Sequence, residues 1–330
     1  MNYEEISLQN NTSELVFSPV TNWNEWDLFL QTSKQRSIFL TSAYLRTCGL
    51  ESAARYLVVD DRVVGGIVVP ELFLETQKDS IRNFSTYQSI WFLPNRSSLL
   101  RQSQGQIDLL TRVGKFLSTN QQGLDLSLHW SIEDVRGLHW AFFDNERKEI
   151  QFIPRYTGIL DLTSFANFEG YIQSLTSGRK ADFKKADSLI VSRQLDDSQI
   201  PSFMKMYKET VVFDDIESQS TALKQVEHII RCSVEAKTGS LWLAKDKNGG
   251  NLSGVFVQEY ESELYYQFGA SNKHNLKLSP NAVILMRIIE NAMERGFEDF
   301  DLVGMNSPKR GAFKASLNPK STLYFQVLIR

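Results

Sequence analysis

The sequence is poor in the residues that cross-link small proteins or hold metals. Its 330 residues include two cysteines, Cys48 and Cys232, which are far apart and in no Cys-X-X-Cys or Cys/His metal-ligand spacing. A disulfide framework and a structural zinc site are therefore not expected, and we expect both thiols to be buried. The four histidines are scattered without a His-X-His or His-X-X-X-His pair. Only His274 falls near the site inferred below, and we expect no metal to be bound.

The sequence also lacks an excess of charge of either sign. It has 36 lysines and arginines against 39 aspartates and glutamates, which gives a net charge of −3. Such a chain is not drawn as a whole to nucleic acid or to an anionic membrane. Any phosphate-bearing partner must therefore be held by a local basic patch, and no stable complex with nucleic acid is expected.

Long apolar runs are missing as well. The most apolar region, residues 63–74, is interrupted by Gly65, Gly66, Pro70 and Glu71, so it is too short to span a bilayer. Residues 1–11 are polar and acidic and contain no apolar stretch of the kind found in signal peptides. These features predict a soluble, cytoplasmic protein.

What the sequence does contain is a well-supplied core and a repeated order of elements. The chain is 42% hydrophobic and 12% aromatic, and its length suggests two domains. Periodicity and turn residues predict helix, helix, hairpin, strand, helix, strand, strand in the first half, and the same order again in the second. The expected ranges are 23–31, 41–50, 55–74, 86–93, 99–117, 124–130 and 138–143, then 198–211, 221–236, 240–260, 263–268, 280–295, 300–303 and 322–329. Two tandem α+β units are expected, over residues 1–154 and 155–330, with 151–193 as the connection. Two unrelated α+β domains are the alternative.

A basic cluster at residues 177–186 precedes the second unit and is expected at the end of a helix. Lys180 and Lys184 are four residues apart, so they share a helix face. One interpretation is a solvated face with internal pairs to Asp182 and Asp187. The other is a clamp on phosphate or carboxylate groups, in which the Arg179 guanidinium supplies a two-pronged fork.

The most informative stretch is residues 297–314. A strand is expected to end at Asp301, whose carboxylate could orient an amine or a cation, and a glycine-containing loop follows. Asn306, Ser307 and the cation Arg310 are suited to binding a substrate, and Lys314 could stabilise an oxyanion or hold a phosphate. The alternative is a surface loop followed by an ordinary amphipathic helix.

These motifs resemble a known family. The passage from Leu278-Ser279-Pro280-Asn281 to Gly296-Phe297, then Phe300-Asp301, Asn306-Ser307-Pro308 and Phe313-Lys314, is similar to the C-terminal signature of the FemAB-like transferases. These form the FemAB-like, or BioF2-like, branch of the GNAT superfamily of N-acetyltransferases. The resemblance extends over about residues 16–324. It implies two tandem GNAT-like domains, each a mixed, mostly antiparallel sheet flanked by helices, with the catalytic site in the second.

The resemblance also implies a reaction. Members transfer an acyl or aminoacyl group from acyl-CoA or aminoacyl-tRNA to an amine, here one of a cell-envelope precursor such as a muropeptide, an amino sugar or an aminolipid. Phe313 would lie beside the reacting ester and Lys314 would stabilise charge, with backbone N–H groups near Tyr266 as oxyanion donors. Arg179 and Lys180 would contact acceptor phosphates. A lipid-linked acceptor would bring the protein to a membrane surface.

Two features depart from the family pattern. The Phe-Gly pair that usually follows Phe-Lys is replaced by Leu317-Asn318-Pro319. The donor loop, expected to hold the co-substrate acyl-CoA through Gly269, Ala270, Ser271 and Asn281, contains a single glycine, whereas close approach to phosphates favours several. No tightly bound cofactor is expected. A non-catalytic GNAT-like module that binds a nucleotide-bearing ligand or a protein partner is the alternative function.

Overall fold

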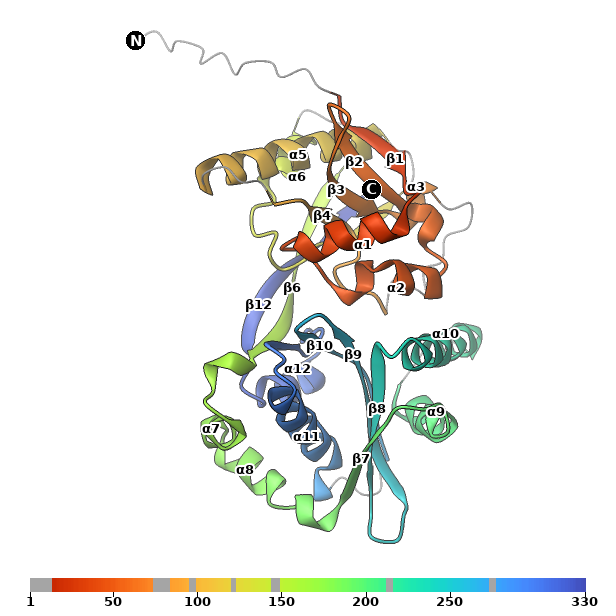
Figure 1. Cartoon of the computed structure of the whole chain (residues 1–330), viewed down its shortest axis with the longest axis vertical. Helices are drawn as coiled ribbons and strands as arrows, with labels where there is room; N and C mark the ends of the chain where they lie inside the picture. The colour runs from red at the N-terminus through yellow and green to blue at the C-terminus, as the bar shows by residue number, and fades with distance from the viewer. Residues whose placement is uncertain are drawn as a thin grey trace.

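The computed structural model describes residues 14–73, 84–94, 99–119, 123–143, 149–211, 216–272 and 277–330. The chain forms two lobes arranged along its long axis and joined by two long strands (Figure 1). His274 and part of the expected donor loop lie outside the described residues.

The N-terminal lobe contains a four-stranded antiparallel sheet in the order β1-β2-β3-β4. At the turn between the second and third strands, Asp60 and Asp61 both have positive φ, 50° and 58°, as a two-residue hairpin turn requires. The strands are β1 (Val16–Pro19), β2 (Ala54–Val59), β3 (Arg62–Val68) and β4 (Ile90–Phe92). The helices are α1 (Trp23–Thr32), η1 (Ile38–Leu40), α2 (Ser42–Thr47), η2 (Glu51–Ala53), α3 (Pro70–Phe73), α5 (Leu99–Thr119) and α6 (Arg136–Trp140).

Two expected strands in this lobe are wrong. The strand expected over 138–143 is helix α6, and the strand expected to continue to residue 74 ends at Val68, after which Pro70 begins α3. Short apolar runs fit a buried helix as well as a strand, and packing decides between them. Here α6 packs tightly on α5. The close approach is shown at Gly137, where a Cβ atom would lie 2.3 Å from the Ile107 carbonyl oxygen.

The second sheet is mixed, with eight strands in the order β5-β12-β6-β11-β10-β9-β8-β7. Most of it builds the C-terminal lobe, while β5 and the adjoining ends of β12 and β6 pack in the N-terminal lobe. Helices α9 and α10 cover one face, while α7, α8 and α11 cover the other (Figure 1). The strands are β5 (Leu124–Ser127), β6 (Ile150–Asp161), β7 (Ile190–Gln194), β8 (Gly239–Lys245), β9 (Asn251–Tyr260), β10 (Glu263–Ser271), β11 (Asp299–Asp301) and β12 (Lys320–Ile329). The helices are η3 (Leu162–Ser164), α7 (Phe168–Ser174), α8 (Ser177–Phe183), η4 (Ala186–Ser188), α9 (Ile200–Thr210), α10 (Ile216–Glu235), α11 (Pro280–Glu294) and α12 (Pro308–Ala315).

The long strands β6 and β12 connect the lobes. They pair along their whole length, from Lys320 opposite Ile159 to Ile329 opposite Ile150, and the far end of β12 also pairs with β5. Val327 and Ile329 are thereby buried in a core with residues of the N-terminal lobe. The expected boundary between residues 154 and 155 falls inside β6 and stays a prediction.

The expected α+β, two-domain fold of mixed sheets flanked by helices is confirmed. The stretch expected as a connection, 151–193, is instead mostly ordered as β6, α7, α8 and β7. The basic cluster spans the whole of the short helix α8 and continues past its end to Lys184 and Lys185, and the Thr176 hydroxyl caps the start of α8 by accepting from the Arg179 N–H. Cys48 is buried, as expected, whereas Cys232 is partly exposed.

Candidate active site

The site lies where two parallel strands part. β10 and β11 pair only from Glu263 opposite Asp299 to Tyr265 opposite Asp301. β11 then ends, while β10 continues to Ser271. On its other side β10 carries a bulge: Tyr266 pairs with Val257 and Phe268 with Phe256, which leaves Gln267 without a partner on β9. The separation of the strands leaves room for side chains of α12 beside β10.

A cavity of about 270 Å³ occupies this place, and we call it the α12 cavity. It is bounded by the end of α9, the second half of β10, the first turn of α11, and α12. The residues that line it and matter below are Tyr207, Tyr266, Gly269, Ala270, Ser271, Asn281, Lys309, Arg310, Phe313 and Lys314.

Lys314 is the most perturbed cation in the α12 cavity. Its Nζ donates to the carbonyl oxygens of Val303 at 2.5 Å and Gly304 at 2.9 Å, and lies 5.0 Å from the centre of the Tyr266 ring. The pKa of Lys314 is lowered to about 8, mainly by burial; the charge on Asp301 opposes the shift and the charge on Arg310 adds to it. An ammonium group has three N–H donors, so the third remains for a ligand in the cavity.

The Tyr266 ring forms the floor under this ammonium group. Burial raises the pKa of Tyr266, and the neighbouring Asn281 side chain and the charge on Arg310 oppose this rise. A Cβ atom on Gly269 would lie 2.1 Å from the Tyr266 hydroxyl oxygen. Glycine is therefore needed at position 269 to admit the tyrosine ring, which is a packing role rather than a close approach to a phosphate.

The loop between β11 and α12 is strained and held from two sides. Val303 has φ of +44° and Gly304 of +68°, and the left-handed region is unfavourable for a β-branched residue such as valine. The Lys314 ammonium group holds the carbonyls of both residues. The Val303 N–H donates to the Asp301 carboxylate at 2.8 Å. Asp301, which precedes the loop, and Lys314, which follows it in α12, thus hold the same short segment at Val303 and Gly304.

Asp301 itself does not line the α12 cavity. It is 4% exposed and accepts a hydrogen bond from the Thr157 hydroxyl at 2.5 Å. Burial raises the pKa of the Asp301 carboxyl, against the opposing effects of Thr157 and the Val303 N–H. The Asp301 carboxylate therefore holds the loop next to Lys314 in place and does not reach a substrate in the cavity.

A second cavity, of about 320 Å³, adjoins the first, and we call it the α11 cavity. Phe313, Asn281 and Ser271 line both cavities, and Arg179 lines the second. The Arg179 guanidinium donates to Asp182 at 2.7 Å and to the Ser316 hydroxyl at 2.6 Å, and lies 4.9 Å from the centre of the Phe313 ring.

The Asp182 carboxylate links the basic cluster to the start of α11. It pairs with Arg179 and Lys185, and it accepts a hydrogen bond from the Ser279 hydroxyl. Both interpretations of the basic cluster thus have a structural counterpart, since Arg179 is paired internally and also faces a cavity.

The structure brings together most, but not all, of the residues expected at the site. Around the α12 cavity lie Lys314, Phe313, Tyr266, Arg310, Gly269, Ala270, Ser271 and Asn281, and Arg179 lies on the adjoining cavity. Lys180 and Ser307 line neither; the Lys180 ammonium group donates to Gln173 at 3.4 Å, and Ser307 is the exposed cap residue of α12. Asn306 faces a different cavity.

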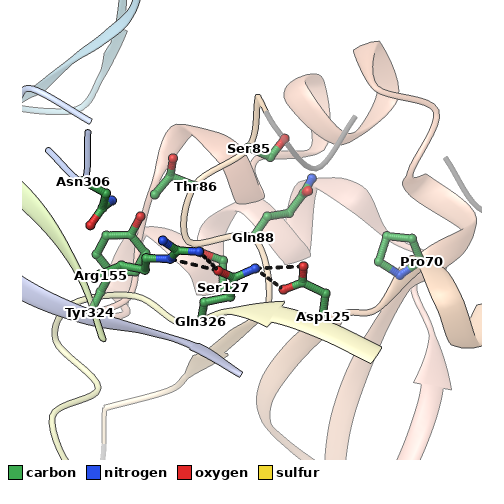
Figure 2. Close-up of a pocket in the computed structure, with 10 residues that line it drawn as sticks. All are labelled: Pro70, Ser85, Thr86, Gln88, Asp125, Ser127, Arg155, Asn306, Tyr324 and Gln326. Carbon is green, nitrogen blue, oxygen red and sulfur yellow. Dashed lines mark hydrogen bonds between the residues drawn. The ribbon is translucent and has the colours of Figure 1, made fainter. Parts of the chain in front are cut away.

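That different cavity, of about 260 Å³, lies at the junction of the lobes, and it was not expected from the sequence (Figure 2). We call it the junction cavity. Its polar side chains come from three strands, β5, β6 and β12, and from loops that are distant in sequence. Gln326 is a single polar residue within the apolar end of β12, and its presence does not reveal which strands flank β12.

Other kinds of site find no support in the described part of the chain. There, no group of three or more histidine, cysteine, aspartate or glutamate side chains could hold a metal ion. The helices in the same residues include none that combines the length and the apolar character needed to cross a bilayer.

Comparison with known protein families gives a match that falls on this region. Residues 177–314 match the family described as an acetyltransferase (GNAT) domain. The match begins at the first residue of α8 and ends at Lys314, so it contains every site residue expected from the sequence. A search of curated protein sequences found no match.

Several solved structures share the fold of nearly the whole chain. FemX superimposes with a TM-score of 0.62 at 13% identity, covering 93% of this chain and 96% of FemX. A conserved protein of unknown function from Bacteroides thetaiotaomicron gives 0.57 at 11% identity, covering 96% and 99%. L-PGS from Bacillus licheniformis gives 0.51 at 11% identity, covering 94% and 92%. At these identities the likeness concerns the fold. Residues 177–314 thus match the acetyltransferase (GNAT) domain family, which supports an acyltransferase, and the fold of nearly the whole chain is similar to that of FemX.

Proposed function

We propose that this protein transfers an acyl or aminoacyl group from acyl-CoA or aminoacyl-tRNA to an amine of a cell-envelope precursor, namely a muropeptide, an amino sugar or an aminolipid. The observation that carries the proposal is the buried Lys314 ammonium group, held at the point where β10 and β11 part. The acceptor class rests on the resemblance to the FemAB-like transferases.

In the proposed reaction the donor carbonyl lies in the α12 cavity and the amine nitrogen attacks its carbon. A C–N bond forms, and the carbonyl oxygen takes up negative charge. The third N–H of Lys314 donates to that oxygen. Collapse of the tetrahedral species breaks the bond to the CoA sulfur or to the tRNA ribose oxygen, and the proton lost by the amine passes to solvent or to the leaving group. Phe313 lies beside Lys314 in the cavity wall, where it shields the reacting ester from water.

The surroundings of the two cavities suit a donor that carries phosphates. Arg179 lines the α11 cavity, and Lys309 and Arg310 line the α12 cavity. The N-terminal turn of the fifteen-residue helix α11 contributes Pro280, Asn281 and Ala282 to the α11 cavity, and a helix N-terminus favours anions. The space beside Gly269 is filled by the Tyr266 ring, so a phosphate could not approach the backbone there. Phosphate binding would therefore depend on these cations and on the N-terminus of α11 rather than on a glycine-rich loop.

The test measures transfer directly. The purified chain is incubated with acetyl-CoA or with labelled aminoacyl-tRNA, and with a muropeptide, glucosamine or an aminolipid as acceptor. Loss of one oxyanion donor typically lowers turnover by about 100- to 1,000-fold, so Lys314→Met is expected to lose activity by that factor. Lys320→Met is the matched control, because Lys320 is an exposed lysine at the start of β12 that lines neither cavity.

Two outcomes would contradict the proposal. Equal turnover of Lys314→Met and wild type would remove Lys314 from the reaction. Donor binding, measured as a thermal shift, without transfer to any acceptor would instead favour a non-catalytic module that binds a nucleotide-bearing ligand.

A further inference from the structure

The junction cavity is a built polar site, separate from the α12 and α11 cavities. It lies between the end of the N-terminal sheet and the strands β5, β12 and β6. Arg155 on β6 is directly opposite Tyr324 on β12, and Gln326 is directly opposite Ser127 on β5. Residues two apart on a strand share a face, so this register gathers side chains from three strands on one wall.

On that wall a guanidinium group, an amide and a carboxylate form a chain of hydrogen bonds (Figure 2). Arg155 Nε and Nη2 both donate to Gln326 Oε1, at 2.9 and 2.7 Å. Gln326 Nε2 donates to the two carboxylate oxygens of Asp125, at 3.0 and 2.9 Å. The amide therefore separates the two charges and holds one edge of the guanidinium group in a fixed orientation.

Within the described residues, the Arg155 guanidinium group keeps N–H donors that no acceptor uses. It has five N–H groups, of which Gln326 takes two. The described residues provide Arg155 with no ion pair, although the side chain is only partly exposed. A planar guanidinium group with free N–H donors, aimed along a cavity wall, fits a carboxylate or phosphate.

A second, independent feature points to a ligand in the same place. Gln88, which lines the junction cavity, is 8% exposed, and its Nε2 is buried without a hydrogen-bond partner. Buried polar groups without partners are rare and call for a specific explanation. Figure 2 shows Gln88 and Thr86 across the hollow from Arg155 and Gln326. Because Gln88 Nε2 itself has almost no accessible surface, the amide must turn toward the hollow to reach a ligand oxygen. That oxygen would give it the acceptor that the described residues do not provide.

We propose that the junction cavity binds the anionic oxygen group of a ligand, a carboxylate or a phosphate. The free N–H groups of Arg155 grip the anion, Gln88 Nε2 donates a further hydrogen bond, and Gln326 and Asp125 keep the guanidinium group in position. The inference goes beyond the proposed transferase function and does not depend on it, because no step of transfer is invoked.

The junction cavity is also connected to the reactive loop. Asn306, in the loop between β11 and α12, lines it, and Asn306 Oδ1 accepts from the Tyr156 N–H at 2.7 Å. The same loop is held by Lys314 through the Val303 and Gly304 carbonyls. A ligand bound here would therefore contact the segment that positions Lys314.

The test is a binding titration at low salt with three probes. N-acetylglycinate presents a carboxylate, inorganic phosphate presents a phosphate, and N-acetylglycinamide is the neutral control. Calorimetry on the purified chain is expected to detect binding of one or both anions and none of the amide. Which anion binds more tightly distinguishes a carboxylate-bearing ligand from a phosphate-bearing one.

Variants then locate the site. Charge-assisted hydrogen bonds contribute enough that Arg155→Met should weaken anion binding by about 10- to 100-fold, and Arg155→Lys should restore only part of it, because lysine lacks the fork. Arg62→Met, at the exposed start of β3, should bind as wild type does. Gln88→Leu is the second variant: it should weaken anion binding without loss of stability, because it removes an unsatisfied buried donor.

Three results would overturn the inference: no binding of either anion, equal binding of the amide, or unchanged anion affinity in both Arg155→Met and Gln88→Leu. If Arg155→Met fails to fold, unchanged affinity in Gln88→Leu alone decides against the site.

Discussion

The lowered pKa of Lys314 predicts that the contribution of this one side chain to stability increases as pH rises from 7 to 10. Burial lowers the pKa of Lys314 from 10.5 to about 8 in the folded protein, while the unfolded chain keeps the ordinary value. Between these two pH values the unfolded state binds a proton that the folded state does not, so the free energy of unfolding increases with pH. At about 1.4 kcal/mol for each pKa unit, the whole effect is about 3.5 kcal/mol, of which about 2.5 kcal/mol falls between pH 7 and 10.

Chemical denaturation at a series of pH values measures this effect without any substrate. Lys314→Met keeps an apolar stem of similar length and removes the titrating group. Wild type should therefore gain about 2.5 kcal/mol relative to this variant between pH 7 and 10. The hydrogen bonds lost to the Val303 and Gly304 carbonyls move the variant's curve by an amount that changes little with pH. The curve of Lys320→Met should run parallel to that of wild type. Parallel curves for wild type and Lys314→Met would refute the buried ammonium group.

Three further predictions concern the loop and the core. Gly304→Ala should lower stability by about 1 kcal/mol, because φ of +68° disfavours alanine although no atom obstructs the new Cβ. Gly178→Ala, whose new Cβ would also meet no atom, lies on helix α8 and should raise stability slightly. Denaturation midpoints of the two variants and wild type measure both effects. Gly311→Ala would place a Cβ atom 2.2 Å from the Met305 carbonyl oxygen, so it should displace the loop and lower both stability and transfer activity, and a wild-type melting curve would contradict the close contact. Burial lowers the pKa of His129 to about 3, so the stability that this neutral imidazole contributes is present above pH 6.5 and is lost as pH falls toward 3. In His129→Gln the loss of stability between pH 6.5 and 4.5 should therefore be smaller than in wild type. An equal loss in the two proteins would contradict the lowered pKa of His129.

Local pattern was sufficient for the long regular elements. The helix expected over 280–295 is observed as α11, and that expected over 99–117 is observed as α5, because each carries one apolar stripe over several turns. The hairpin turn at 248–250 also lies where Asn-Gly-Gly predicts it, between β8 and β9. Residues 138–143 were mistaken for a strand because five or six apolar positions do not distinguish the two periods.

The same distinction between local and long-range information applies to the candidate sites. Lys314 and Phe313 belong to one contiguous motif, so the sequence could nominate them, and the structure places both on the α12 cavity. Arg155 and Gln326 are 171 residues apart and meet only through the register of β6 and β12. No local pattern encodes that register, because it depends on which strands become neighbours in the folded sheet.

The pairing of β12 with β5 has a consequence for the order of synthesis. Leu124 is opposite Ile329 in the finished sheet, so β5 leaves the ribosome about 200 residues before its partner exists. At translation speeds of about 5–20 residues per second, that strand edge and its apolar side chains wait on the order of 10 seconds or more. The lobe encoded first is thus completed last, and it is the part of the nascent chain most in need of protection from aggregation.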